Sequence, residues 1–387
     1  MLEPRNTEVY SIQNRQEMRP YLQKAGEVIR AGGLVCFPTE TVYGLGADAF
    51  NDKAVADIFH AKNRSFENPV ALHLHAVEEI EKYVKKINKR TEALMAKFLP
   101  GPLMLICEKN ERVSDIITGG QRKCGIRIPR HEAALEFLKE CGTPVAATSA
   151  NKSGRLACVN ARDILEDLGG RIDVLLDDGN TPLGIESTVL DVTSDPPRII
   201  RPGFITMEEI AVVIGIPPIF SDNIVKARYE KMDTVPKVKK ILLEGDEDSI
   251  VRKVIDYINK AGDKKIGIVL TDETMARLEG LKYTYNMGPR DDPAAVAHKI
   301  FEILRNLERQ EVEIILVEGI PREGLGRTLM IKLSQMSEEV VKLNEEAPSL
   351  HPAEIQVVQA ADEPVPQPEE VTAPQPDEAV PDQNEEG

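Results

Sequence analysis

Side chains suited to an anionic ligand gather between positions 39 and 64 of this 387-residue chain. Thr39, Thr41 and Tyr43 place three hydroxyls just after a short apolar run, and Lys62 and Arg64 follow on a second loop. Hydroxyls and cations that meet at the ends of strands can bind the oxygens of a phosphate group. The segment therefore predicts a site for a phosphate-bearing ligand.

Each part of this segment also has a plainer interpretation. Gly44 and Gly46 follow a strand, but Ala49 stands where a dinucleotide fingerprint has its third glycine. A Lys and an Arg two residues apart more often form solvated surface, and His73 on the apolar run 70–74 is more often a core histidine. No Walker motif and no zinc-spaced set of ligands occurs, so no metal ligand is predicted.

Five further motifs follow along the chain. They are Pro-Gly-Pro at 100–102, Gly-Ile-Arg-Ile-Pro at 125–129, Thr-Ser-Ala-Asn-Lys-Ser-Gly at 148–154, Glu-Ser-Thr-Val-Leu-Asp at 186–191 and Arg-Pro-Gly at 201–203. In this order and spacing they resemble the YrdC-like domain of threonylcarbamoyl-AMP synthases, over roughly residues 12–215. Val-Glu-Gly at 317–319 and Glu-Gly-Leu-Gly at 323–326 resemble the C-terminal domain of the longer, two-domain synthases, over roughly residues 239–340.

The resemblance implies that L-threonine, bicarbonate and ATP condense to threonylcarbamoyl-AMP and pyrophosphate. It implies a product used by the tRNA-modification machinery, on the adenosine beside the anticodon, and Mg²⁺ that enters with ATP. A weak RNA contact of the enzyme is also expected as a possible partner interaction. The alternative function is a module that binds double-stranded RNA or tRNA with little or no catalysis. A carbamoyl-adenylate domain of metallocentre maturation is a third reading, which lacks its zinc-finger and acylphosphatase-like segments here.

The resemblance also implies roles for particular residues. The catalytic residues are Lys62 and Arg64. The L-threonine contacts are Thr41, His73, Arg127, Ala147 and Ser187. The ATP contacts are Arg64, Asn68, Lys123, Ser149, Asn151, Arg201 and Tyr229. Independently of the family, Arg127 within an apolar strand needs a partner, and its planar fork suits a carboxylate. Thr148 to Asn151 could instead form a plain helix N-cap.

The chain departs from the family pattern at three places. Lys62-Asn63-Arg64-Ser65 stands where Lys-Gly-Arg-Pro is usual, and Met104 stands where a threonine is common. Lys226-Ala227-Arg228-Tyr229 is all that resembles the Tyr-Arg-His-Tyr-type segment expected over the active site. The sequence therefore leaves open whether the linker that contains these four residues closes over the active site.

The elements that must position these residues alternate between strands and helices. A stripe that includes Met18, Leu22, Ala25 and Ile29 predicts a helix, and short apolar strands are expected from 34–37 to 188–191. The predicted fold is α/β: a YrdC-like twisted mixed sheet with helices (1–215), a linker (216–237) and a smaller Rossmann-like domain (238–344). The last helix of that domain is predicted over 325–343.

Composition separates an acidic tail from the rest. Residues 345–387 hold twelve Asp or Glu and no Lys or Arg, against a net charge of −16 for the whole chain. This Pro-rich tail is expected to be disordered, whereas residues 1–344 are near neutral and able to carry local basic surface. Five cysteines without metal spacing, no signal sequence and no long apolar run predict reduced thiols, no membrane contact and a cytoplasmic location.

Overall fold

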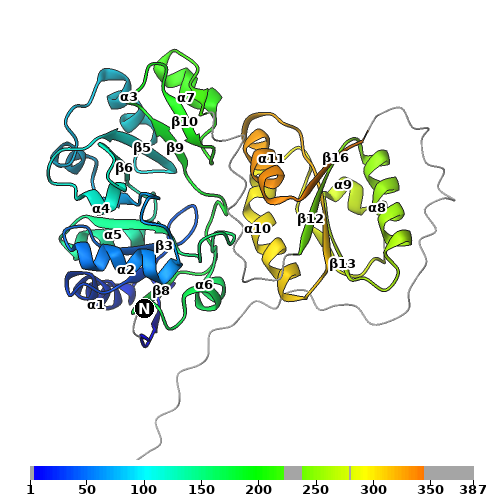
Figure 1. The fold of residues 1–387 in the computed structure, drawn as a ribbon, viewed down its shortest axis with the longest axis horizontal. Coiled ribbons are helices and arrows are strands. Elements are labelled where there is room, and N and C mark those ends of the chain that lie inside the picture. Colours follow the sequence, from blue (N-terminus) through cyan, green and yellow to red (C-terminus); the bar gives the residue numbers. More distant parts are fainter. Residues whose placement is uncertain (1–3, 222–237, 279, 344–387) are drawn as a thin grey trace, which may run out of the picture.

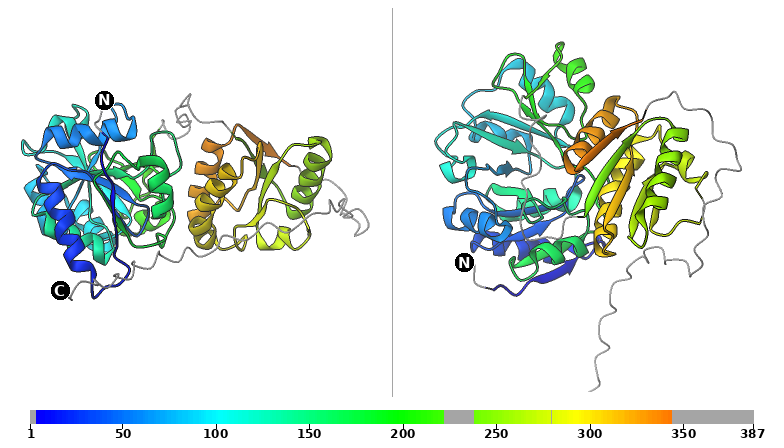
Figure 2. Two further views of the ribbon diagram at one scale, coloured as in Figure 1. Left: turned by 90° about the horizontal axis from the view of Figure 1, so that it is seen from below. Right: turned by 45° about the vertical axis from the view of Figure 1, so that its right-hand side comes forward.

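The computed structural model describes residues 4–221, 238–278 and 280–343, which form two α/β domains that lie side by side (Figure 1). Two further views show the same separation (Figure 2). Tyr229, most of the predicted linker and the predicted disordered tail lie outside the described residues. The α/β fold class, with a mixed sheet followed by a smaller domain, is confirmed.

The first domain is built on a mixed sheet. In the described ranges this sheet has eleven strands, in the order β1-β8-β2-β3-β7-β4-β6-β5-β9-β10-β11. They are β1 (Glu8–Ser11), β2 (Val35–Phe37), β3 (Gly44–Asp48), β4 (Ala71–His73), β5 (Leu103–Glu108), β6 (Lys123–Arg127), β7 (Val145–Ser149), β8 (Val174–Asp177), β9 (Thr188–Asp191), β10 (Arg198–Arg201) and β11 (Ile219–Phe220).

β11 lies in a range that the sequence assigned to the linker. Its residues Ile219 and Phe220 pair in parallel with Arg198 and Ile199 of β10, so the first sheet extends to Phe220. Two residues are too few to show the alternation of apolar and polar side chains by which a strand is recognised.

Helices cover both faces of this sheet. They are α1 (Met18–Arg30), α2 (Asp52–Lys62), the 3₁₀ helix η1 (Val77–Lys82), α3 (Lys89–Phe98), α4 (Asp115–Thr118), α5 (Glu132–Cys141), α6 (Ala161–Leu168) and α7 (Met207–Ile214). Along β2, Val35 and Phe37 join a core shared with α1 and α5, whereas Cys36 joins the core on the opposite face. Successive side chains of a strand point to opposite faces of the sheet, so β2 contributes to the buried core on both faces.

The second domain is a parallel five-stranded sheet with the order β14-β13-β15-β12-β16, counted over the residues described. Its strands are β12 (Lys239–Glu244), β13 (Ile266–Leu270), β14 (Thr284–Asn286), β15 (Ile314–Glu318) and β16 (Glu339–Lys342), and its helices are α8 (Glu247–Ala261), α9 (Asp272–Met275), α10 (Pro293–Arg309) and α11 (Gly324–Met336). Helices α10 and α11 lie toward the first domain, and α8 lies on the far side (Figure 1).

The predicted helix over 325–343 is wrong in its last part. α11 ends at Met336, Ser337 is already extended, and residues 339–342 form β16, which pairs in parallel with β12. Val340 and Val341 are adjacent β-branched residues, which favour a strand. The prediction is too long because it includes these two apolar residues in the stripe of the helix.

The two domains share an apolar cluster. Leu156 and Ile185 of the first domain pack in one cluster with buried residues of α10 and α11, among them Leu304 and Leu329. A shared apolar cluster indicates a fixed interface rather than two domains on a loose tether. No helix among the described residues is long and apolar enough to cross a membrane.

Candidate active site

A cavity of about 270 Å³ lies against one face of the central strands of the first sheet. Its lining includes Ala71 and His73 of β4, Gly125 and Arg127 of β6, and Ala147 of β7. Residues two apart on a strand share a face, so these side chains form a common floor. A Cβ added to Gly125 would lie 3.0 Å from the Met104 sulfur, so a larger residue would crowd this floor.

Arg127 occupies one end of the cavity and faces the loop after β2, residues 39–43, which we call the hydroxyl loop. Its Nη2 lies 2.6 Å from Thr41 Oγ1, 3.0 Å from Glu40 Oε2 and 3.3 Å from Thr39 Oγ1. Arg127 and Glu40 are both buried, with side chains 6% and 7% exposed. Arg127 Nε and Glu40 Oε1 are buried and have no hydrogen-bond partner among the described residues. The partner that a buried arginine needs is therefore Glu40, and two polar atoms remain unsatisfied.

His73 lines the same end of the cavity as a neutral side chain. Burial, together with the Arg127 charge, lowers the pKa of His73 to about 3. Its Nδ1 lies 3.4 Å from the carbonyl of Ala71, and its ring packs edge-on against Phe37. A neutral imidazole can donate or accept one hydrogen bond without competing with Arg127 for an anion.

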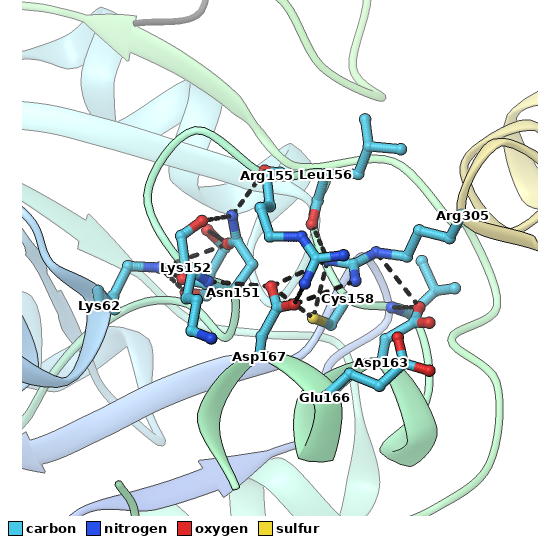
Figure 3. Close-up of polar contacts among 12 residues, drawn as sticks. Lys62, Asn151, Lys152, Arg155, Leu156, Cys158, Asp163, Glu166, Asp167 and Arg305 are labelled. Carbon is cyan, nitrogen blue, oxygen red and sulfur yellow. Dashed lines mark hydrogen bonds and ion pairs between the residues drawn. The ribbon is translucent and has the colours of Figure 1, made fainter. Parts of the chain in front are cut away.

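Lys62, the last residue of α2, lies behind the cavity wall rather than in it. Its ammonium donates to the carbonyls of Ser149 and Asn151, the latter at 2.5 Å, and lies 3.3 Å from Asn151 Oδ1 (Figure 3). Burial and the nearby Arg64 charge lower the pKa of Lys62 from 10.5 to about 7. Ser149 Oγ donates to Asn151 Oδ1 at 2.6 Å, so Lys62, Ser149 and Asn151 form one bonded cluster.

Residues 149–151 do not begin a helix, so the plain N-cap interpretation of this segment is wrong. Ser149 ends β7 and lines the cavity, whereas Asn151 is 7% exposed and does not line it. The Asn151 amide instead donates to the carbonyls of Lys152 and Arg155, at 2.9 and 2.8 Å. Asn151 thus fixes the loop that follows β7.

Two arginines line the other parts of the cavity. Arg64 donates through Nε to the carbonyl of Asn68 at 3.1 Å, and this contact holds the loop after α2. Arg201, at the end of β10, donates to the carbonyl and the hydroxyl of Ser187 at 3.0 and 3.2 Å. Asn68 and Ser187 are therefore placed as supports of these arginines, and neither lines the cavity.

The structure does not bring every predicted residue into the cavity. Lys123 lies on β6, two residues before Gly125, but does not line the cavity, and its ammonium pairs with Asp191 Oδ2 at 2.8 Å. Thr41 is fully buried and does not line the cavity, but its hydroxyl contacts two residues that do, Arg127 and Thr39. Tyr229 lies outside the described residues.

Sequence reasoning missed three charged residues around this site. Glu40 stands between Thr39 and Thr41 in the hydroxyl loop, and this position was the sequence signal that could have identified it. Glu186 lines the cavity directly before Ser187, and its Oε2 pairs at 2.6 Å with Lys332 of α11. Burial alone would raise the pKa of Glu186, but Lys332 and Arg201 lower it to about 2. Nothing in the sequence indicated that Lys332 approaches this site.

Comparisons with known proteins agree with this arrangement. A family model described as "Telomere recombination" matches residues 27–203, and one described as "Threonylcarbamoyl-AMP synthase, C-terminal domain" matches residues 235–335. The two matches assign the first domain to the YrdC-like class and the second to the C-terminal domain of these synthases.

Relatives extend the match over both domains. A threonylcarbamoyl-AMP synthase from Pyrococcus abyssi is 38% identical over 322 residues, covering 81% of this chain and 93% of the relative. One from Bacillus subtilis is 35% identical, covering 81% and 92%. A crystal structure of P. abyssi Sua5 complexed with L-threonine matches with a TM-score of 0.79 at 35% identity, covering 87% of this chain and all of that chain. The chain therefore belongs to the threonylcarbamoyl-AMP synthase family, which is a family of enzymes.

Proposed function

We propose that this chain condenses L-threonine, bicarbonate and ATP to threonylcarbamoyl-AMP and pyrophosphate. The observation that supports this most directly is Arg127, which lines the cavity and whose buried Nε has no hydrogen-bond partner among the described residues. The carboxylate of an α-amino acid is an acceptor that such a guanidinium can bind. A structure of a relative is described as a complex with L-threonine, which supports the same ligand for this cavity.

The reaction has two steps. The threonine amine adds to the carbon of carbon dioxide and loses a proton, or attacks bicarbonate with loss of water, and in either case becomes a carbamate. A carbamate oxygen then attacks the α-phosphorus of ATP, the bond to the bridging oxygen breaks, and pyrophosphate leaves with that oxygen. Such a transfer requires in-line positioning and nearby cations more than covalent catalysis by the protein.

The cavity residues divide between the two substrates. Arg127 would bind the threonine carboxylate, with Thr41 holding the guanidinium and with neutral His73 and Ala147 beside the amino acid. Arg64 and Arg201 would approach the phosphates, and Ser149 would contact the nucleotide. Lys62 and Asn151 would act from behind the wall by orienting Ser149.

Magnesium would enter as its ATP complex. Glu186, which lines the cavity, already pairs with Lys332, and Glu40, which lies next to the cavity, already pairs with Arg127. Phosphate oxygens and water, which are the usual ligands of Mg²⁺ in nucleotide sites, would therefore hold the ion. The product is activated for transfer of its threonylcarbamoyl group, so we propose the tRNA-modification machinery as its consumer. We place the reaction in the cytoplasm.

The test is pyrophosphate release from ATP and bicarbonate, measured with and without L-threonine. Arg127→Ala should lower threonine-dependent release about 10²- to 10³-fold, comparable to losing one transition-state donor. Arg130→Ala is the matched control, since this nearby arginine bonds the carbonyl of Pro100 and does not line the cavity. Absence of release, or release that does not depend on threonine, would contradict the proposed synthase, and absence of release would favour the RNA-binding alternative. Threonine-dependent release that survives Arg127→Ala would contradict only the role of Arg127 as the carboxylate contact.

A further inference from the structure

A buried cluster of charges joins helix α10 of the second domain to helix α6 of the first. Arg305 of α10, with its side chain 2% exposed, lies 3.2 Å from Asp167 Oδ2 and 3.6 Å from Asp163 Oδ2. Both aspartate side chains are fully buried. Two buried carboxylates require counter-charges, and Arg305 and Arg309, both on α10, supply two of these from the other domain. We call Arg305, Asp163 and Asp167 the interdomain cluster (Figure 3).

The interdomain cluster also holds the loop at residues 151–158. Asp167 accepts hydrogen bonds from the Lys152 amide at 3.0 Å and from the Arg155 guanidinium. Arg305 Nη2 donates directly to the carbonyl of Leu156 and lies 3.3 Å from the Cys158 sulfur. Arg305 therefore contacts one part of the loop itself and reaches its beginning through Asp167.

The same loop orients Asn151. The Asn151 amide donates to the carbonyls of Lys152 and Arg155, which leaves Oδ1 to accept from Ser149 Oγ and from Lys62 (Figure 3). Hydrogen bonds, linked through the backbone at residues 152 and 155, thus connect α10 to the wall of the cavity. If the carbonyls at 152 and 155 moved, the Asn151 side chain would lose the contacts that fix its orientation.

We propose that Arg305 is a positioning residue for the Lys62, Ser149 and Asn151 cluster, so that the second domain completes the active site of the first. This proposal rests on the proposed synthase function for the role of that cluster. Arg305 comes from a seventeen-residue helix packed in a shared apolar core, and such an element holds a site more firmly than a loop does. The contribution of the second domain is then support of the nucleotide side of the cavity.

The test is a double-mutant cycle with Arg305→Met and Asn151→Ala, in the full chain. Arg305→Met should lower kcat/KM for ATP at least tenfold, and should change it less than twofold once Asn151 is already alanine. Arg309→Met is the matched control one turn further along α10, because Arg309 contacts Asp163 and Glu166 but not Asp167 or Leu156. It should change kcat/KM less than twofold while losing a comparable amount of thermal stability.

Two outcomes would overturn this role for Arg305. One is that Arg305→Met lowers kcat/KM for ATP by the same factor whether residue 151 is asparagine or alanine. The other is that Arg309→Met lowers kcat/KM as much as Arg305→Met does. If Arg305→Met does not fold, Arg305→Lys replaces it. That variant keeps the charge, but its ammonium ends one bond short of the position from which Nη2 bonds both Asp167 and Leu156, so full activity would again overturn the proposal.

The same cycle should also be measured as ATP affinity by calorimetry. A wild-type chain without threonine-dependent pyrophosphate release would contradict the proposed synthase function. The calorimetric cycle would still decide the role of Arg305, because a loss of ATP affinity that depends on Asn151 supports it and an independent loss overturns it. The two failures are therefore distinguishable.

Discussion

Each domain contains an arginine paired with a buried glutamate, and the two pairs differ in what surrounds them. Arg127 and Glu40 lie 3.0 Å apart in the first domain, and Arg290 and Glu318 lie 2.6 Å apart in the second. The first pair leaves Arg127 Nε and Glu40 Oε1 without partners among the described residues. The charges are the same in both pairs, but Arg290 is 22% exposed where Arg127 is 6% exposed, and the glutamates differ in the hydrogen bonds that the rest of each domain supplies.

The second pair is completed by its own domain. Glu318 accepts from the amide and hydroxyl of Thr271, at 2.8 and 3.0 Å, and from the hydroxyl of Thr274 at 2.8 Å. Leaving a buried polar atom unpaired costs about 1–3 kcal/mol, so an unsatisfied pair persists where a ligand can complete it. The comparison therefore separates a binding pair at Arg127 from a structural pair at Arg290.

The largest effect on stability is expected for Glu318→Ala. The change leaves Arg290 and the Thr271 amide without their acceptor and should cost about 3–5 kcal/mol of unfolding free energy. The threonine-dependent rate per folded molecule should stay within twofold. Urea unfolding checks the stability, with Glu339→Ala as control, because its pair with Lys239 is exposed and should contribute about 1 kcal/mol or less.

Glu40→Gln should affect threonine binding more than stability, which is the opposite of the result expected for Glu318→Ala. The amide keeps the shape of the side chain but removes the unpaired anionic oxygen, so the KM for threonine should rise about tenfold. The loss of unfolding free energy should be smaller than for Glu318→Ala, about 1–2 kcal/mol, because Arg127 lines a cavity open to water. Steady-state kinetics and urea unfolding measure the two quantities. An unchanged KM with a stability loss equal to that of Glu318→Ala would remove the distinction between the pairs.

Much of the fold was accessible from local sequence patterns. Met18, Leu22, Ala25 and Ile29 are buried on α1 as their spacing predicts, because helix periodicity is a local property. β16 was missed because a neighbouring helix pattern masked a four-residue strand. The α/β alternation thus followed from the sequence, whereas the ends of elements depended on tertiary pairing.

The candidate site was predicted in part, for a similar reason. His73, Arg127, Ala147 and Ser149 lie at one cavity because they stand on neighbouring strands, which short motifs can indicate. The docking of Lys332 onto Glu186, 146 residues earlier in the chain, has no local signal. Contacts between domains depend on how two completed surfaces fit, so the sequence alone did not reveal them.

A third pair, Lys332 and Glu186, joins the two domains and gives the smallest predicted effect, which depends on pH. Above pH 4.5 Glu186 is ionised in both the folded and the unfolded chain, and its interaction with Lys332 stabilises the fold. The folded pKa of about 2 lies below the ordinary 4.5, so this stabilisation is lost as the pH falls through that interval. Burial lowers the pKa of Lys332 despite Glu186, which offsets part of the gain.

Lys332→Met should therefore reduce the unfolding free energy by less than about 2 kcal/mol at pH 7, and the difference from wild type should shrink toward pH 2. Urea unfolding at several pH values measures this difference. Arg327→Met is the control on the same helix, because its interdomain pair with Glu208 is more exposed and should contribute at most about 1 kcal/mol. A Lys332→Met difference that grows as the pH falls would show that Glu186 is not held ionised by Lys332. The interdomain pair would then be structural in the same sense as Arg290 and Glu318, without electrostatic influence on the cavity.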